Sequence, residues 1–221
     1  MNLPNKITLT RIFLIPVFTV IFFLTVIPYN YFIACLIFIV AACTDFIDGH
    51  IARKYNLVTN LGKFLDPIAD KVLVSTALIC MLVKPEILLV MWAAEWVMIV
   101  SGICVAVILA RELIVSGFRM VAASTGLVLA ADKVGKVKTT FQDIAIAMLL
   151  AGANFFGLVT ASKVFNVIGL VCLAVATVLT IWSGVGYIVK NKKVFSAPAT
   201  KGQSAAKEDE EKEGDAVSES K

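Results

Sequence analysis

Long apolar stretches separated by short polar segments dominate the chain. Six of them can be delimited, at residues 7–27, 31–49, 66–83, 87–110, 140–158 and 164–189. Each is near the roughly 20 apolar residues that a helix needs to cross about 30 Å of hydrocarbon. The uncharged turn at Pro28, Tyr29 and Asn30 and the proline at position 85 separate neighbouring stretches. The pattern predicts an all-α protein, a polytopic membrane helix bundle with about six transmembrane helices.

Basic residues gather in alternate connections between these stretches. They lie at the start, after the second stretch, after the fourth and at the end: Lys6 and Arg11; His50, Arg53, Lys54 and Lys63; Arg111, Arg119, Lys133, Lys136 and Lys138; and Lys190, Lys192 and Lys193. Cytoplasmic segments of membrane proteins carry an excess of Lys and Arg. We therefore expect an integral protein of a bacterial cytoplasmic membrane with both termini on the cytoplasmic side.

Three segments lie outside this simple pattern. A short N-terminal segment is expected at the membrane interface, and the first apolar stretch is expected to be retained as a span. Residues 111–124 mix apolar and charged positions, which suits either a short interfacial helix or an extension of the fourth span. Residues 196–221 contain the charge run KEDEEKE and no apolar periodicity, so we predict a membrane domain at 1–195 and a disordered charged tail at 196–221.

Composition agrees with a membrane protein. The chain has 221 residues, of which 59% are hydrophobic and 16% charged, and its mean hydropathy is +0.90. Five cysteines are scattered through apolar stretches without the spacing of a zinc site or a disulfide framework. The net charge of +4 mixes basic loops with an acidic tail, so it indicates no nucleic-acid partner and none is expected.

Candidate chemistry is concentrated in TDFIDGHIARKYNLVTNLGKFLDPIADK, where the second stretch ends and the third begins. This segment contains Asp45, Asp48, Asp66 and Asp70 among largely apolar neighbours. The members of each pair are three or four residues apart, so on helices each pair projects from one face. Two antiparallel helices would bring the two pairs together.

Four converging carboxylates need a cation to offset their mutual repulsion and the cost of placing them at a membrane edge, about 2.5 to 3.5 kcal/mol each. Oxygen ligands without His or Cys favour Mg²⁺ or Mn²⁺ over zinc, and four carboxylates can hold two ions. Gly49 and Ala52 leave room beside the acids, Gly62 permits close backbone approach, and Arg53 offers donors to a phosphate.

These residues read D-x2-D-G-x2-A-R-x8-G-x3-D-x3-D, from Asp45 to Asp70. The pattern resembles the motif of the CDP-alcohol phosphatidyltransferase family without departure at any of its eight fixed positions. The six-span layout is also that family's. The flanking segments NLPNKITLTRIFLIPVF and RELIVSGFRMVAASTGLVLAADKVGKVKTT are similar to the bacterial phosphatidylglycerophosphate synthases of the family, and the resemblance covers about residues 1–190.

The resemblance implies a reaction in which an alcohol displaces CMP from CDP-diacylglycerol, with glycerol 3-phosphate as the acceptor and phosphatidylglycerophosphate as the lipid product. It implies that Asp45, Asp48, Asp66 and Asp70 hold Mg²⁺ or Mn²⁺, with Asp70 the base and Asp66 also catalytic. The nucleotide and diphosphate would contact further residues: Asp48, Gly49, Ala52, Arg53, Gly62, Asn5 and Thr8. A homodimer in membrane lipid is usual in such families.

The acceptor's phosphate needs cations of its own, and four basic residues are available near the predicted cytoplasmic face: Arg111, Arg119, Lys136 and Lys138. The alternative for these four is that they only set the topology. Other acceptors, such as serine or inositol phosphate, would use the same reaction class. From a different class, a divalent-cation transporter would also place carboxylates in a membrane, but the spans lack inverted-repeat symmetry and Gly/Pro-broken pairs.

Other polar residues have simpler interpretations. Helix capping explains one or two acids of the motif but not four. Asp132 and Asp143 are isolated, which favours solvation or a local salt bridge, and His50 is expected to be interfacial rather than a ligand. Glu95 falls inside the fourth stretch, where an acid is expected to have a partner or to be protonated.

Overall fold

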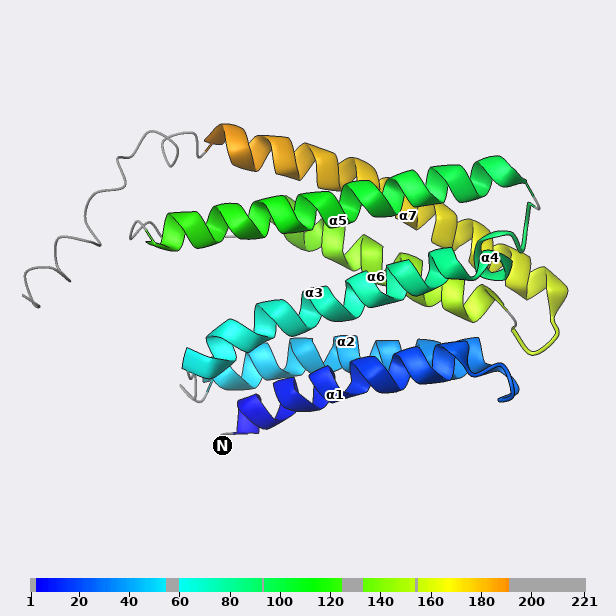
Figure 1. The fold of residues 1–221 in the computed structure, drawn as a ribbon, viewed down its shortest axis with the longest axis horizontal. Helices are drawn as coiled ribbons and strands as arrows, with labels where there is room; N and C mark the ends of the chain where they lie inside the picture. The colour runs from blue at the N-terminus through cyan, green and yellow to red at the C-terminus, as the bar shows by residue number, and fades with distance from the viewer. Residues whose placement is uncertain (1–2, 55–59, 93, 125–132, 154, 191–221) are drawn as a thin grey trace, which may run out of the picture.

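The computed structural model describes residues 3–54, 60–92, 94–124, 133–153 and 155–190. Within these ranges the chain forms helices and no strand (Figure 1), so the predicted all-α class is confirmed for this part of the chain. The helices, in chain order, are α1 (Leu3–Phe23), α2 (Asn30–Lys54), α3 (Asn60–Val83), the single turn α4 (Pro85–Leu88), α5 (Glu95–Ser124), α6 (Lys133–Ala153) and α7 (Val159–Lys190).

Several helices extend beyond the apolar stretches from which they are predicted. α2 continues to Lys54, α3 already begins at Asn60 and α6 at Lys133. Hydropathy detects only the apolar part of a helix, whereas backbone hydrogen bonding continues into the polar ends. Residues 111–124 are the end of α5, so the second of the two interpretations of this segment is correct. The N-terminal segment from Leu3 is likewise part of α1, and its position at the membrane interface stays a prediction.

The fourth predicted stretch is wrong at its start. Pro85 opens the short turn α4, and α5 begins only at Glu95. Asn166 of α7 accounts for this interruption, because its side-chain nitrogen donates to the carbonyl oxygen of Ile87 at 2.8 Å and its oxygen accepts from the Met91 amide at 3.3 Å. Glu95 is therefore an exposed residue in the first turn of α5 and not an acid inside a span.

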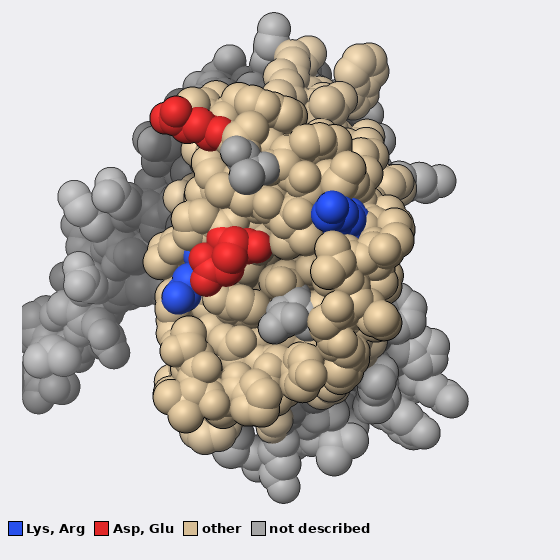
Figure 2. All heavy atoms as spheres, turned by 90° about the vertical axis from the view of Figure 1, so that its right-hand side faces the viewer, with Lys and Arg blue, Asp and Glu red and all other residues tan. Residues whose placement is uncertain are grey.

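The long helices run back and forth, so that their ends form two groups (Figure 1). We call "motif end" the end of the bundle where α2 ends and α3 begins, at the left of Figure 1. α1 begins there, and α5 and α7 end there. Figure 2 shows the opposite end, a largely uncharged surface with few acidic or basic side chains. The aspartate motif and the basic segments therefore share one end.

Contact between helices is most extensive for α6 with α7 and for α1 with α2, and α1 also contacts α3. The core contains side chains that are almost fully buried, such as Phe18, Phe38 and Leu149. Large apolar side chains also point outward, and Trp182 is 75% exposed. In the described ranges Glu95–Arg119 and Val159–Tyr187 are long and apolar enough to cross a membrane. A helical protein with outward apolar faces of this kind fits a bilayer better than water.

Candidate active site

All four motif aspartates lie on helices at the motif end. Asp45 and Asp48 are on the last turns of α2, and Asp66 and Asp70 are in the first half of α3. The helical condition on which the pairing of these acids depended is therefore confirmed. The described side chains include Asp70, which is half-buried, whereas the side chains of the other three lie outside them.

The remaining nucleotide-binding candidates share this end of the bundle by their backbone positions. Gly49, Ala52 and Arg53 are on α2, Gly62 is on α3, and Asn5 and Thr8 are on α1. Their side chains, like that of His50, lie outside the described ones. A described neighbour, Arg11 of α1, is buried, and its Nε donates to the Ala41 carbonyl of α2 at 3.2 Å. This contact holds α1 against α2 one turn before Asp45.

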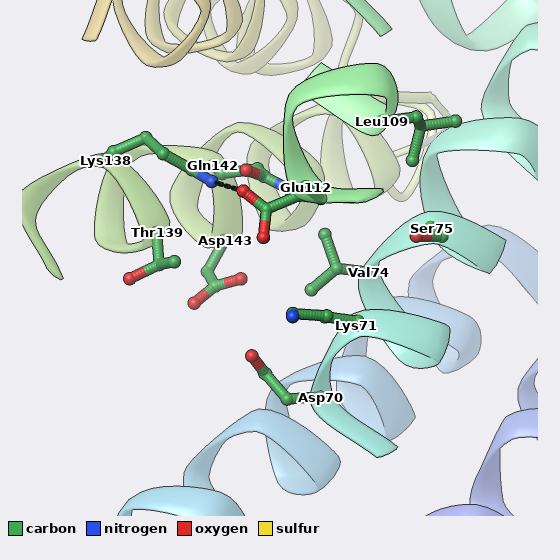
Figure 3. Close-up of a pocket in the computed structure, with 10 residues that line it drawn as sticks. All are labelled: Asp70, Lys71, Val74, Ser75, Leu109, Glu112, Lys138, Thr139, Gln142 and Asp143. Carbon is green, nitrogen blue, oxygen red and sulfur yellow. Dashed lines mark hydrogen bonds and ion pairs between the residues drawn. The ribbon is translucent and has the colours of Figure 1, made fainter. Parts of the chain in front are cut away.

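A small pocket opens beside Asp70, between α3, α5 and α6 (Figure 3). Its volume is about 20 Å³. Five of its lining residues are ionisable: Asp70, Lys71, Glu112, Lys138 and Asp143. Asp70 and Asp143 project into it from opposite sides, and the Lys71 side chain points toward the same space. Acidic and basic groups thus meet at the last aspartate of the motif.

A buried ion cluster forms one wall of this pocket. Oε1 of Glu112 pairs with the Lys138 ammonium and also accepts from Arg111 Nη1 at 3.0 Å. The side chain of Lys138 is 1% exposed and that of Glu112 is 18% exposed. Burial lowers the pKa of Lys138, which precedes the fifth predicted span, and the attraction of Glu112 offsets part of that shift.

Arg111 is held from two sides. Its Nη2 donates to the Ser183 hydroxyl of α7 at 2.9 Å, while Nη1 bonds Glu112. A methyl group at Gly184 would lie 3.1 Å from Cγ of Arg111, so the glycine leaves the room in which this side chain crosses α7. Arg111 Nε is buried and has no hydrogen-bond partner within the described part of the chain. The guanidinium therefore keeps an unused donor.

The four predicted acceptor-site residues do not form one group. Arg111 and Lys138 meet at Glu112. Arg119 lies farther along α5, where its Nε donates to the Tyr187 hydroxyl at 3.3 Å and its guanidinium stacks 5.4 Å from that ring. Lys136 is exposed near the start of α6. Only Lys138 lines the pocket, and Arg111 lies behind the wall as a partner of Glu112.

Sequence reasoning missed three participants and undervalued a fourth. Glu112, Lys71 and Gln142 line the pocket but were not among the candidate site residues, and Asp143 was interpreted as isolated. Lys71 donates to the Ser116 hydroxyl of α5, which links α3 to α5. Glu112 and Asp143 are acids beside apolar runs, the signal that could have found them. Asp132 lies outside the described residues.

The carboxylate oxygens of the motif are ligands of the kind that a hard divalent cation prefers. Asp70 presents carboxylate oxygen to the pocket, and the helix ends that carry the other three motif acids lie at the same end of the bundle. Among the described residues there is no cluster of three or more His, Cys, Asp or Glu side chains that could hold a metal. The predicted four-aspartate site depends on side chains outside that set and stays a prediction.

The motif, the helical bundle and the polar pocket at Asp70 are the features expected of a lipid-modifying transferase. The sequence model of the CDP-alcohol phosphatidyltransferase family matches residues 1–182. The chain belongs to this family, which confirms the resemblance recognised from the aspartate motif.

Three relatives are similar over most of their length. The chain is 44% identical to a protein of Bacillus subtilis (strain 168) over 201 residues, covering 86% of this chain and 95% of the relative. It is 37% identical to one of Rickettsia felis over 198 residues, covering 88% and 97%. It is 40% identical to one of Shigella flexneri serotype 5b over 189 residues, covering 85% and 93%. Each relative is named "CDP-diacylglycerol--glycerol-3-phosphate 3-phosphatidyltransferase".

Proposed function

We propose that the chain transfers the phosphatidyl group of CDP-diacylglycerol to glycerol 3-phosphate, giving phosphatidylglycerophosphate and CMP. The observation that carries the proposal is the pocket at the motif end, which Asp70 lines together with Lys138 and Glu112. Arg111 adds a second cation behind this wall, because it pairs with the same Glu112. A carboxylate base and cations for a phosphate are the two requirements of a phosphorylated alcohol acceptor. The names of the relatives support the same donor and acceptor.

In the reaction, the acceptor's hydroxyl oxygen bonds to the phosphorus that carries diacylglycerol, and the bond from that phosphorus to the CMP oxygen breaks. Asp70 takes the hydroxyl proton, a role supported by its side chain, the one described side chain of the four motif acids, which lines the pocket. Asp45, Asp48, Asp66 and Asp70 would hold Mg²⁺ or Mn²⁺, two ions in all. Bound there, the metal supplies charge neutralisation for the pyrophosphate and the departing CMP.

Recognition of the donor falls to residues around α2. Arg53 on α2 offers charged donors to the pyrophosphate, while Gly49, Ala52 and Gly62 keep the space beside it free of bulky side chains. Asn5 and Thr8, on the first turns of α1, contribute polar groups at the same end. The assignments on α2 and α3 rest on the match of each position to the family's motif, whereas those of Asn5 and Thr8 rest on their place in the N-terminal segment.

Recognition of the acceptor falls to the basic residues of α5 and α6. Arg111 is the first candidate, because its buried Nε has no hydrogen-bond partner in the described part of the chain and its neighbours lie on the pocket wall. Lys138 contributes its charge from inside that wall. Arg119 and Lys136, farther out at the motif end, are placed to draw an anionic acceptor toward the pocket.

We also propose the membrane location, the orientation and the oligomeric state of the enzyme. The six long helices cross a bacterial cytoplasmic membrane, the motif end faces the cytoplasm, and two copies form a homodimer. The basic segments at the motif end and the nearly uncharged opposite end (Figure 2) support this orientation. Water-soluble glycerol 3-phosphate would then reach the site from the cytoplasm, and CDP-diacylglycerol from the bilayer.

The catalytic assignment is tested by Asp66→Asn and Asp70→Asn in purified, folded protein. With CDP-diacylglycerol, glycerol 3-phosphate and Mg²⁺, each change should lower the rate of CMP release by about a hundredfold or more, in line with the loss of a general base or of a metal ligand. Glu95→Gln removes an exposed acid at the opposite end of the bundle and is the matched control. Near-normal CMP release by either aspartate variant would refute the assignment.

A further inference from the structure

The two cations proposed to bind the acceptor's phosphate already share an anion. Oε1 of Glu112 contacts the Lys138 ammonium and lies 3.0 Å from Arg111 Nη1. Its second carboxylate oxygen points into the pocket (Figure 3). Glu112 therefore occupies, with a single negative charge, the position toward which an acceptor's phosphate would be drawn.

The pocket is too small for an acceptor in this arrangement. Its volume of about 20 Å³ is room for about one water molecule. A phosphate can reach Arg111 and Lys138 only if a lining group moves aside. Lys138 is the least able to move, because its side chain is 1% exposed, whereas that of Glu112 is 18% exposed.

We propose that Glu112 is an internal counter-anion that the acceptor's phosphate displaces from Arg111 and Lys138. The inference rests on the proposed function, because it uses the acceptor that function assigns. Without an acceptor, the carboxylate compensates the buried charge of Lys138, which would otherwise be costly. A phosphate carries more charge and more acceptor oxygens than a carboxylate, so it can take over both cations.

Arg111 has a contact that holds it in place independently of Glu112. Arg111 keeps its 2.9 Å hydrogen bond to the Ser183 hydroxyl, and Gly184 leaves the space for its stem. Its Nε, beside Gly184, has no hydrogen-bond partner among the described residues. Glu112 thus competes with the acceptor and sets how tightly the acceptor binds, without touching the reacting atoms.

The test is the binding of inorganic phosphate and of glycerol 3-phosphate to the full chain in detergent micelles, together with the Michaelis constants for CMP release. Glu112→Gln should bind both anions about tenfold more tightly than the wild type, because it lacks the competing charge. Its Michaelis constant for CDP-diacylglycerol should be unchanged. If Glu112 only held the cations in place, Glu112→Gln would instead weaken the binding of both anions, because the loosened cations would bind phosphate less well.

Glu86→Gln is the matched control, because Glu86 is also a paired acid, 3.8 Å from Lys84 and hydrogen-bonded to the Tyr31 hydroxyl, but at the opposite end. It should leave anion binding unchanged. If Glu112→Gln does not fold, Glu112→Asp keeps a counter-charge for Lys138 on a side chain shorter by one carbon. It should tighten binding by about threefold, because a withdrawn carboxylate competes less.

Unchanged or weaker phosphate binding by the folded Glu112→Gln variant, or by Glu112→Asp if the Gln variant does not fold, would overturn the inference. The proposed function would still stand if the wild type releases CMP with glycerol 3-phosphate. If the wild type releases no CMP with glycerol 3-phosphate, the proposed function itself fails, and the inference fails with it.

Discussion

Among the described glycines, Gly169 of α7 is the one where an added methyl group would come nearest to a neighbouring helix, at Leu149 of α6. A methyl group at Gly169 would lie 2.6 Å from Cγ of Leu149 and 3.1 Å from its backbone nitrogen. Leu149 is fully buried, so it cannot turn away into open space. Small residues at such crossings let two membrane helices approach closely. Gly169→Ala should therefore force α6 and α7 apart.

The magnitude follows from two opposing effects. Overpacking a close-packed core costs about 1–3 kcal/mol, and contacts with both a branch carbon and the backbone put this site in the upper part of that range. Replacing Gly by Ala inside a helix returns about 1 kcal/mol. The net loss expected for Gly169→Ala is about 1–2 kcal/mol of the free energy of unfolding.

Gly186→Ala on the same helix provides the control, because a methyl group there would meet nothing within 4 Å. It should be neutral or stabilising by up to about 1 kcal/mol. Unfolding of both variants in mixed micelles, followed by helical circular dichroism, measures the difference. A Gly169 variant as stable as the Gly186 variant would refute the packing of α6 against α7 described above.

Three further results are expected. Asn166→Leu leaves the Ile87 carbonyl and the Met91 amide without their partner, and should destabilise the protein by about 2–4 kcal/mol in the same unfolding assay. Gly184→Ala crowds the side chain of Arg111, so it should raise the Michaelis constant for glycerol 3-phosphate severalfold. The Michaelis constant for CDP-diacylglycerol should not change, and equal effects on both constants would argue against the acceptor role of Arg111. Chelation with EDTA should abolish CMP release, and Mg²⁺ or Mn²⁺ should restore it, whereas activity in EDTA would exclude the metal proposal.

Much of the fold is visible in the hydropathy of the chain, because long apolar runs leave a helix in a membrane as almost the only option. The prediction of a helix at 31–49 corresponds to α2, and the turn at Pro28 separates α1 from α2 as expected. The start of α5 is misplaced by the hydropathy pattern because residues 87–110 are apolar apart from a few positions such as Glu95. The group that interrupts them is Asn166, a partner far along the chain that no local pattern reveals.

In the candidate site, too, the sequence predicts the local features but not the contacts between distant parts of the chain. The spacing of the four aspartates is local, so the sequence predicts correctly that they lie on two neighbouring helix ends. The pairing of Glu112 with Lys138 joins α5 to α6 across 26 positions, and it depends on how these helices pack. From the sequence, Lys138 is a candidate for the acceptor's phosphate or a charge that only sets the topology, and neither interpretation predicts that it is among the most deeply buried side chains of the described residues.

The central claim is the transfer of a phosphatidyl group to glycerol 3-phosphate, and the lipid product tests it most directly. Purified protein would receive CDP-diacylglycerol and Mg²⁺ with equal concentrations of glycerol 3-phosphate, inositol phosphate and serine, and the lipids would be identified by mass spectrometry. Phosphatidylglycerophosphate should form, in amounts equal to the CMP released. Formation of a different phospholipid, or of none, would contradict the account.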